Sequence, residues 1–211
     1  MNRQSIAGNY VEPFVQHRDK WSECVKCDLH KTACQKVFFR GQLPAHICFL
    51  GQAPGAGEDE LGLPFVGEQG QILDEIIAGS IGEYNRKRLK VPGHSLTELR
   101  FAITNIVCCY PPNDRAPETG EIEACSFRLA EFLTMTKCRL LVLVGKKALV
   151  GYLRCLKYRN NKHIRSIEIT NPGFMLRKGQ QGAEGSGSSD RELEIARATA
   201  LISEALPKVF K

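Results

Sequence analysis

Residues 47–67 read ICFLGQAPGAGEDELGLPFVG. The first four residues are an apolar run that contains an aromatic and a β-branched side chain, which is typical of a short buried strand. A glycine-rich turn occupies 51–67, and apolar residues at 72, 73, 76 and 77 then recur at helical spacing. A strand followed by a glycine-rich turn and a helix is the repeating unit of parallel α/β sheets, so this stretch decides the fold class.

Three further apolar runs resemble the first, being short and rich in residues that buried strands favour. They cover 101–104, 140–144 and 164–170. Helical patterns of apolar residues lie between them, at 122–134 and 146–156. The alternation predicts an α/β fold of three αβα layers around a central, mainly parallel four-stranded sheet.

The length and composition fit one domain over 1–211, because 211 residues with 43% hydrophobic content can bury a full core. Within it we expect an N-terminal extension over 1–22. We also expect a flexible loop over 179–190, where the sequence GQQGAEGSGSSD has low complexity.

The composition also bounds the class of protein. No apolar run in residues 1–10 resembles a signal peptide, and no window approaches the roughly eighteen apolar residues of a membrane span. We therefore expect a monomer in a reducing, cytoplasmic compartment with no membrane partner. The net charge of +6 comes with basic clusters in loops and in the second half, such as Arg177-Lys178. These clusters fit either a polyanionic partner or a solvated basic face.

Nine cysteines are an odd number and a poor disulfide framework for a reducing compartment. Cys24 and Cys27 form a close pair, and Cys109 and Cys125 follow far along the chain. Four thiolates in this pattern suggest a buried metal centre that joins the N-terminus to the middle of the fold. Zinc and an iron–sulfur cluster both accept four thiolates, and Cys108 is an alternative to its neighbour Cys109.

Polar residues or glycines follow each predicted strand. The strand ends are Gly51-Gln52, Asn105, Gly145-Lys146 and Asn171-Pro172-Gly173. The carboxyl ends of parallel strands meet at one edge of a sheet, where open α/β sheets bind ligands. We therefore expect the functional site at this edge.

The order of these motifs resembles the iron–sulfur-containing family 4 of uracil-DNA glycosylases. The resemblance runs from Cys24 to Arg177, and the carriers are the four cysteines, the 51–67 block, Ile103-Thr104-Asn105, Pro111-Pro112 and the segment 171–177. It implies the fold of that family and hydrolysis of the N-glycosidic bond of uracil in DNA, which leaves an abasic site. It also implies a 4Fe-4S cluster held by Cys24, Cys27, Cys109 and Cys125. The partner would be uracil-containing DNA, single- or double-stranded.

The resemblance also implies roles for single residues. Phe65 would stack on the extruded base, and the amide of Asn105 would pair with O4 and N3–H of uracil. The alternative interpretation of Phe65 is an ordinary core aromatic, and that of Asn105 is a strand-end turn residue. Ala53 and Gly55 would line the base pocket, while Gly57, Arg177 and Lys178 would contact DNA phosphates. Glu58 would exclude the thymine methyl group or organise water, or else be a surface carboxylate.

Two departures from the family pattern affect the chemistry. Gln52 replaces the glutamate of the first motif, and Asn171 replaces the histidine that begins the last one. Loss of a donor aimed at a developing oxyanion costs about 3 kcal/mol, so the resemblance implies a slow enzyme in which Gln52, Glu58 and Asn171 are the catalytic residues. The Asn-Pro pair is similar to the mismatch-specific branch of the superfamily. A glycosylase for another deaminated base and a DNA- or uracil-binding protein without turnover remain the alternatives.

Overall fold

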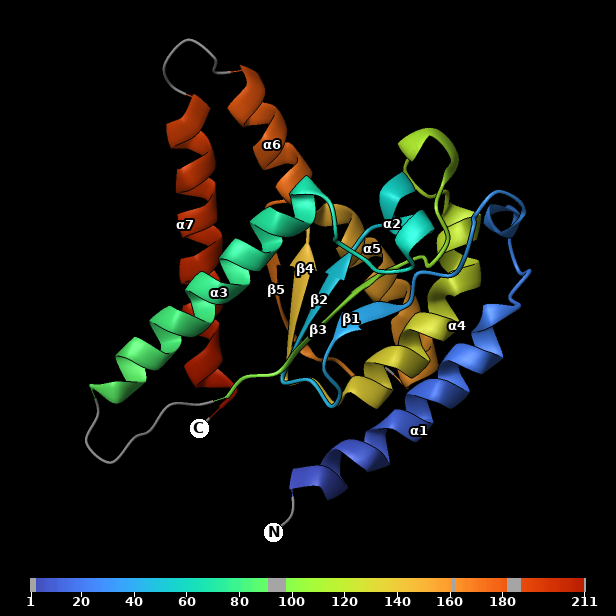
Figure 1. Ribbon diagram of the computed structural model, residues 1–211, viewed down its shortest axis with the longest axis horizontal. Coiled ribbons are helices and arrows are strands. Elements are labelled where there is room, and N and C mark those ends of the chain that lie inside the picture. Colours follow the sequence, from blue (N-terminus) through green and yellow to red (C-terminus); the bar gives the residue numbers. More distant parts are fainter. Residues whose placement is uncertain (1–2, 91–97, 161, 182–186, 211) are drawn as a thin grey trace.

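The structure is a computed structural model, and it describes residues 3–90, 98–160, 162–181 and 187–210. A twisted sheet in the order β1-β3-β2-β4-β5 stands at the centre (Figure 1). Its strands are β1 (Phe39–Gly41), β2 (Ile47–Gly51), β3 (Phe101–Asn105), β4 (Leu140–Val144) and β5 (Arg165–Ile169). The four predicted strands are present and parallel to one another, which confirms the α/β fold class.

The prediction of four strands was short by one. β1 pairs with β3 in the antiparallel direction, with Phe39 opposite Thr104. It has only three residues, of which none is fully buried, and it lies at the edge of the sheet. A strand this short has no apolar run of its own, because its stability comes from pairing with β3.

Helices cover both faces of the sheet, which confirms the three layers (Figure 1). α3 (Glu68–Leu89) and α7 (Gly187–Ala205) pack on one face, and α4 (Thr119–Thr136) and α5 (Lys146–Cys155) pack on the other. Successive strand residues point to opposite faces of the sheet. Phe49 packs in the core under α3 and α7, and Leu50 packs in the core under α4 and α5. All residues of β2 and β4 are buried, as expected for central strands covered on both sides.

The segment 1–22, expected to be an extension, contains α1 (Arg3–Ser22), which packs outside α4. Its buried Trp21 donates from Nε1 to Glu131 of α4 at 2.7 Å. The predicted loop 179–190 overlaps helices at both ends, because α6 (Pro172–Gln181) and α7 extend into it. Residues 182–186 lie outside the described residues.

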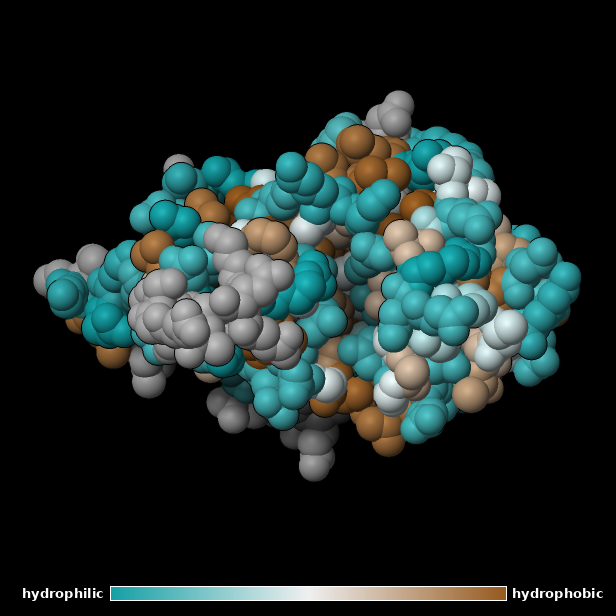
Figure 2. All heavy atoms as spheres, turned by 90° about the horizontal axis from the view of Figure 1, so that it is seen from above, coloured by the Kyte–Doolittle hydropathy of each residue, from teal (hydrophilic) through white to brown (hydrophobic). Residues whose placement is uncertain are grey.

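The strand ends lie at one level, as the site prediction requires. Gly51 of β2 pairs with Asn105 of β3, and Val144 of β4 pairs with Ile169 of β5. Short helices follow at this edge, namely α2 (Ala56–Leu61) after β2 and α6 after β5. Figure 2 looks down on the edge and shows a mostly polar surface with a hollow between the two halves of the molecule. In the part of the chain described here, no helix could span a membrane.

Candidate functional site

A cavity of about 810 Å³ opens at the carboxyl ends of the parallel strands. The glycine-rich turn, the starts of α3, α5 and α6, and the 3-10 turn η2 (Pro112–Asp114) form its wall. The structure gathers eight of the predicted site residues on this wall, and they are Gln52, Ala53, Gly55, Gly57, Glu58, Phe65, Asn171 and Arg177. Lys178 belongs to α6, but its side chain lies outside the described residues.

Asn105 lies beneath the cavity and not on its wall. Its side chain is buried, and neither the Oδ1 nor the Nδ2 atom of its amide has a hydrogen-bond partner. The amide and the ring of Phe65 both contact Gly51, where a Cβ atom would overlap both of them. An unsatisfied buried donor or acceptor costs about 1–3 kcal/mol, so this amide is available to a ligand that carries one donor and one acceptor.

Phe65 has a backbone conformation that is rare for a bulky residue, with φ = 57°. Arg40 of β1 holds it there, because Nε donates to Pro64 O at 2.8 Å and Nη2 donates to Phe65 O at 3.0 Å. The same guanidinium pairs with Asp74 of α3 at 2.7 Å. Gly70 lies against the Phe65 carbonyl, where any Cβ atom would overlap it. The ring is thus fixed before any ligand arrives.

Glu58 joins the glycine-rich turn to the Phe65 segment. Its Oε2 accepts a hydrogen bond from the Gly55 N–H at 3.1 Å, and the backbone N–H groups of Phe65 and Val66 also donate to the carboxylate. Burial raises the pKa of Glu58 above its usual value, although these three N–H groups act in the opposite direction.

We expect Glu58 to impose an acid limit on activity. The raised pKa means that this carboxyl takes up its proton at a higher pH than an exposed glutamate does. Protonation replaces one acceptor oxygen of the carboxylate with an O–H donor, so the hydrogen bonds between Glu58 and the Phe65 segment change as the pH falls through that pKa. A pH–rate profile should therefore show an acid limb, and Glu58→Gln, which does not titrate there, should be slower but lack that limb. An unchanged limb in Glu58→Gln would assign it to another group.

Asn171 precedes the first residue of α6 and caps it. Its Oδ1 accepts a hydrogen bond from the Gly173 N–H at 2.8 Å, and its carbonyl accepts from Phe174 N at 2.9 Å. The side chain lies over Gly145, whose φ is +86°. Because the cap engages the amide oxygen, the Nδ2 group is the part of this side chain that can donate to a ligand in the cavity.

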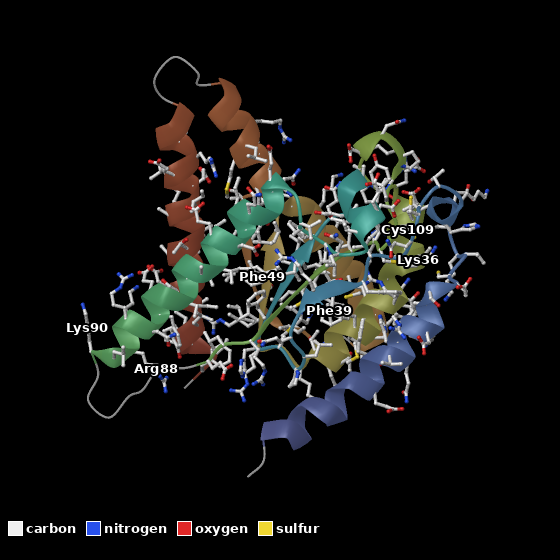
Figure 3. The ribbon with its side chains drawn as sticks, in the orientation of Figure 1. Lys36, Phe39, Phe49, Arg88, Lys90 and Cys109 are labelled. Atoms are coloured by element: carbon white, nitrogen blue, oxygen red, sulfur yellow. The ribbon has the colours of Figure 1, made fainter. Side chains whose placement is uncertain are left out.

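The four predicted cysteine ligands come from three segments. Cys24 and Cys27 precede the 3-10 turn η1 (Asp28–Lys31), Cys109 follows β3, and Cys125 lies in α4. Burial raises the pKa of the Cys27 thiol, and the nearby thiols of Cys125 and Cys24 raise it further. A hydrogen bond from Cys108 lowers the pKa of Cys109, and Lys36, beside it in Figure 3, acts the same way.

Cys108 is also close to this centre, since its Sγ lies 3.9 Å from that of Cys125. Cys109 has both Cys27 and Cys125 as electrostatic neighbours, which favours it as the ligand. Among the described residues, no three or more His, Cys, Asp or Glu side chains are already arranged to hold a metal ion. Of the other cysteines, Cys48, Cys138 and Cys155 are buried and Cys34 is exposed.

The profile of the Uracil DNA glycosylase superfamily matches residues 38–192, which covers most of the fold and every wall of the cavity. The chain belongs to this superfamily. Relatives named Type-4 uracil-DNA glycosylase include proteins of Archaeoglobus fulgidus, 39% identical over 125 residues, and Pyrobaculum aerophilum, 38% identical over 122. A third, from Sulfurisphaera tokodaii, is 36% identical over 136 residues. These matches cover 59%, 58% and 64% of the chain, and the chain spans just over half of each relative, at 56%, 55% and 56%.

Some wall and support residues of this superfamily member were missed by the sequence prediction. Lys147 lines the cavity beside Lys146 at the start of α5, and Asp114 lines it from η2. Arg40 supports Phe65 from a strand that has no apolar signal. The strand-end rule placed Lys146 at this edge without a role, and Lys147, the next residue, could have been found in the same way.

Proposed function

We propose that this superfamily member is a DNA glycosylase that hydrolyses the N-glycosidic bond of uracil and leaves an abasic site. The observation that carries the proposal is the unpartnered amide of Asn105 beside the fixed ring of Phe65, beneath the cavity. Uracil offers an acceptor at O4 next to a donor at N3–H, and these two groups match the unpartnered N–H donor and oxygen acceptor of the Asn105 amide. The printed names of the relatives support the same reaction.

In the proposed mechanism, the uracil nucleotide leaves the base stack and enters the cavity. Its ring stacks on Phe65, while the Asn105 amide donates to O4 and accepts from N3–H. Ala53 and Gly55, on the same wall, would bound the pocket with their backbone. Both recognition groups are held by the fold before binding, so little ordering is needed when the base arrives.

The bond between C1′ and N1 then breaks, and its electron pair stays on the uracil ring, where charge develops at O2. The Nδ2 group of Asn171 would donate to O2, because the cap on α6 leaves this group free. A water adds its oxygen to C1′ and its proton passes to the uracil anion that has left, and the amide oxygen of Gln52 would orient that water. Glu58 would act by positioning, since three backbone N–H groups occupy its carboxylate.

Asn171 can be tested with two substitutions that separate its cap from its donor. Asn171→Asp keeps an oxygen for the Gly173 N–H but has no N–H of its own, so uracil excision should fall by about 10²–10³. Its melting temperature should stay close to that of the wild type. Asn171→Ala should lose the same activity and also about 1 kcal/mol of stability with the cap. Single-turnover rates and thermal unfolding measure the two effects, and full activity in Asn171→Asp would remove Asn171 from the mechanism.

DNA would be bound mainly through its phosphates, by the Gly57 N–H and by the basic residues Arg177 and Lys178 in the middle of α6. Arg177 is exposed on the cavity wall, as this role requires. The partner is uracil-containing DNA, single- or double-stranded, and one copy of the chain would act as a monomer.

We also propose that Cys24, Cys27, Cys109 and Cys125 hold a 4Fe-4S cluster with a structural role. Four thiols are a donor set suited to such a cluster. A fully buried guanidinium, that of Arg128, lies beside Cys125 and has no carboxylate partner in the described residues, so an anionic centre fits there. The visible absorption spectrum and the iron and zinc content of the purified protein would separate the cluster from zinc.

The decisive experiment incubates the purified protein with a single-stranded oligonucleotide that contains one uracil and then treats the DNA with alkali. Cleavage at uracil, and none at cytosine or thymine in the same position, is the expected result. Gln52 and Asn171 in place of the usual acid and histidine favour one alternative, a protein that binds uracil-containing DNA without turnover. Binding without cleavage would select that alternative, and cleavage only at another deaminated base would select a glycosylase of different specificity.

A further inference from the structure

Arg128 of α4 is fully buried, with only 1% of its surface exposed. A guanidinium stays protonated in proteins, and a buried charge without a counter-charge costs several kcal/mol. Within the described parts of the chain, no aspartate or glutamate lies within ion-pair distance of it. Something other than a carboxylate must therefore compensate this charge.

One side of the guanidinium contacts the end of β3. Nη2 donates to the carbonyl of Asn105 at 2.7 Å and to that of Ile106 at 3.2 Å. Nη1 donates to Thr104 Oγ1 at 3.4 Å. These acceptors satisfy hydrogen bonds but carry no charge, and they belong to the residue that would read uracil and its two neighbours.

The other side of the guanidinium faces the cysteines. Cys125 precedes Arg128 by three residues, which places both on the same side of α4. Cys125, Cys108 and Cys109 are electrostatic neighbours of the guanidinium, and its buried Nε atom has no hydrogen-bond partner. A metal ligand is a thiolate, so these neighbours become negative when the centre is loaded.

We propose that Arg128 is a positioning residue that neutralises the charge of the cysteine centre and, with the same guanidinium, fixes the main chain of Asn105 for base reading. The inference rests on the proposed function, because it assigns a support to the residue that reads uracil. It also explains why an arginine is needed. A lysine can supply the charge at this position, but a single ammonium cannot hold two carbonyls and a hydroxyl in fixed directions.

Two variants separate the positive charge of Arg128 from its set of directed hydrogen-bond donors. Arg128→Met removes both, and Arg128→Lys keeps the charge alone. Arg154→Met is the matched control, since Arg154 is a half-buried arginine of the neighbouring α5 whose charge is already paired with the carboxylate of Glu123 at 3.5 Å. For each protein we would measure the rate of metal loss to a chelator, the single-turnover rate of uracil excision, and the affinity for the same oligonucleotide without uracil.

We expect Arg128→Met to lose metal about 10–100-fold faster than the wild type and to excise uracil more slowly by a similar factor. Arg128→Lys should retain metal like the wild type, yet excise about 10–100-fold more slowly, because Asn105 is no longer held. Affinity for uracil-free DNA should be unchanged in both, since Arg128 is buried and contacts no DNA. Arg154→Met should match the wild type in all three measurements.

Wild-type metal retention in Arg128→Met would overturn the electrostatic half of the proposal, and wild-type excision in Arg128→Lys would overturn the positioning half. If Arg128→Met does not fold, Arg128→Lys still tests the role of the directed hydrogen bonds. Arg128→Gln, which keeps polar groups without charge, then tests the role of the charge. A wild type that cleaves no uracil would refute the proposed function instead. The metal-loss comparison would then still decide whether Arg128 balances the cysteine centre.

Discussion

Replacement of Asn105 by leucine should stabilise the protein and abolish uracil excision at the same time. Leucine has a similar volume but removes two buried polar atoms that have no partner, each of which costs about 1–3 kcal/mol. The free energy of unfolding should therefore rise by a few kcal/mol. Loss of a hydrogen-bonding reader of the base should reduce excision by about 10⁴-fold. Denaturant unfolding and single-turnover kinetics on a uracil oligonucleotide measure the two effects.

Thr104→Val is the matched control, because Thr104 is the neighbouring residue of β3 and is equally buried. Its hydroxyl donates to Phe38 O at 2.6 Å, so it is satisfied where the Asn105 amide is not. The valine variant should lose about 1–3 kcal/mol of stability, opposite in sign to Asn105→Leu. If both substitutions destabilise the protein equally, the Asn105 amide has a partner in the free protein, and the interpretation of this amide as a vacant recognition group is wrong.

Cys27→Ser should cost more stability than any other single substitution proposed. The segment between α1 and β1 contains only the four-residue η1 as regular structure, and Leu29 is its one buried apolar residue before Val37 among the described residues. Apparent binding free energies of structural metal sites reach about 10 kcal/mol, so loss of one ligand should cost about 5 kcal/mol. That corresponds to a decrease of about 10–20 °C in melting temperature for a chain of this size.

Cys34→Ser is the control for this variant, because Cys34 is exposed and lies in the same segment. It should retain metal and the wild-type melting temperature, while Cys27→Ser should lose both. Metal analysis and thermal unfolding on matched samples give the answer. A Cys27→Ser protein with full metal content would exclude Cys27 as a ligand, and parallel variants of Cys108 and Cys109 would show which of the two binds.

The central sheet could be predicted from the sequence because its four parallel strands carry their own apolar runs. β1 could not be predicted, since Arg40 and Gly41 give it no strand signal and its stability comes from β3, more than sixty residues away. The same is true of Arg128. A charged residue in the middle of an apolar helix normally indicates the solvent face, and only the assembled fold shows that this one is buried.

The site was predictable as a set of residues but not as a set of roles. The ends of β2 and β3 place Gly51 beside Asn105, which the parallel arrangement already requires. The engagement of Glu58 by three backbone groups and the cap made by Asn171 depend on how the loops fold back. Loop geometry of this kind has no periodic pattern, so the sequence named these side chains as catalytic without showing that each also holds the backbone.

The pairing of β1 has a consequence for the order of folding. β1 must wait for β3, because Phe39 pairs with Thr104 and the closure of such a long chain segment has a high entropic cost. Arg40 belongs to β1, and its side chain donates hydrogen bonds to the carbonyls of Pro64 and Phe65. A chain in which β1 has not paired with β3 therefore lacks the contacts that hold the carbonyls of Pro64 and Phe65. The proposed stacking position of Phe65 is complete only when the sheet is complete.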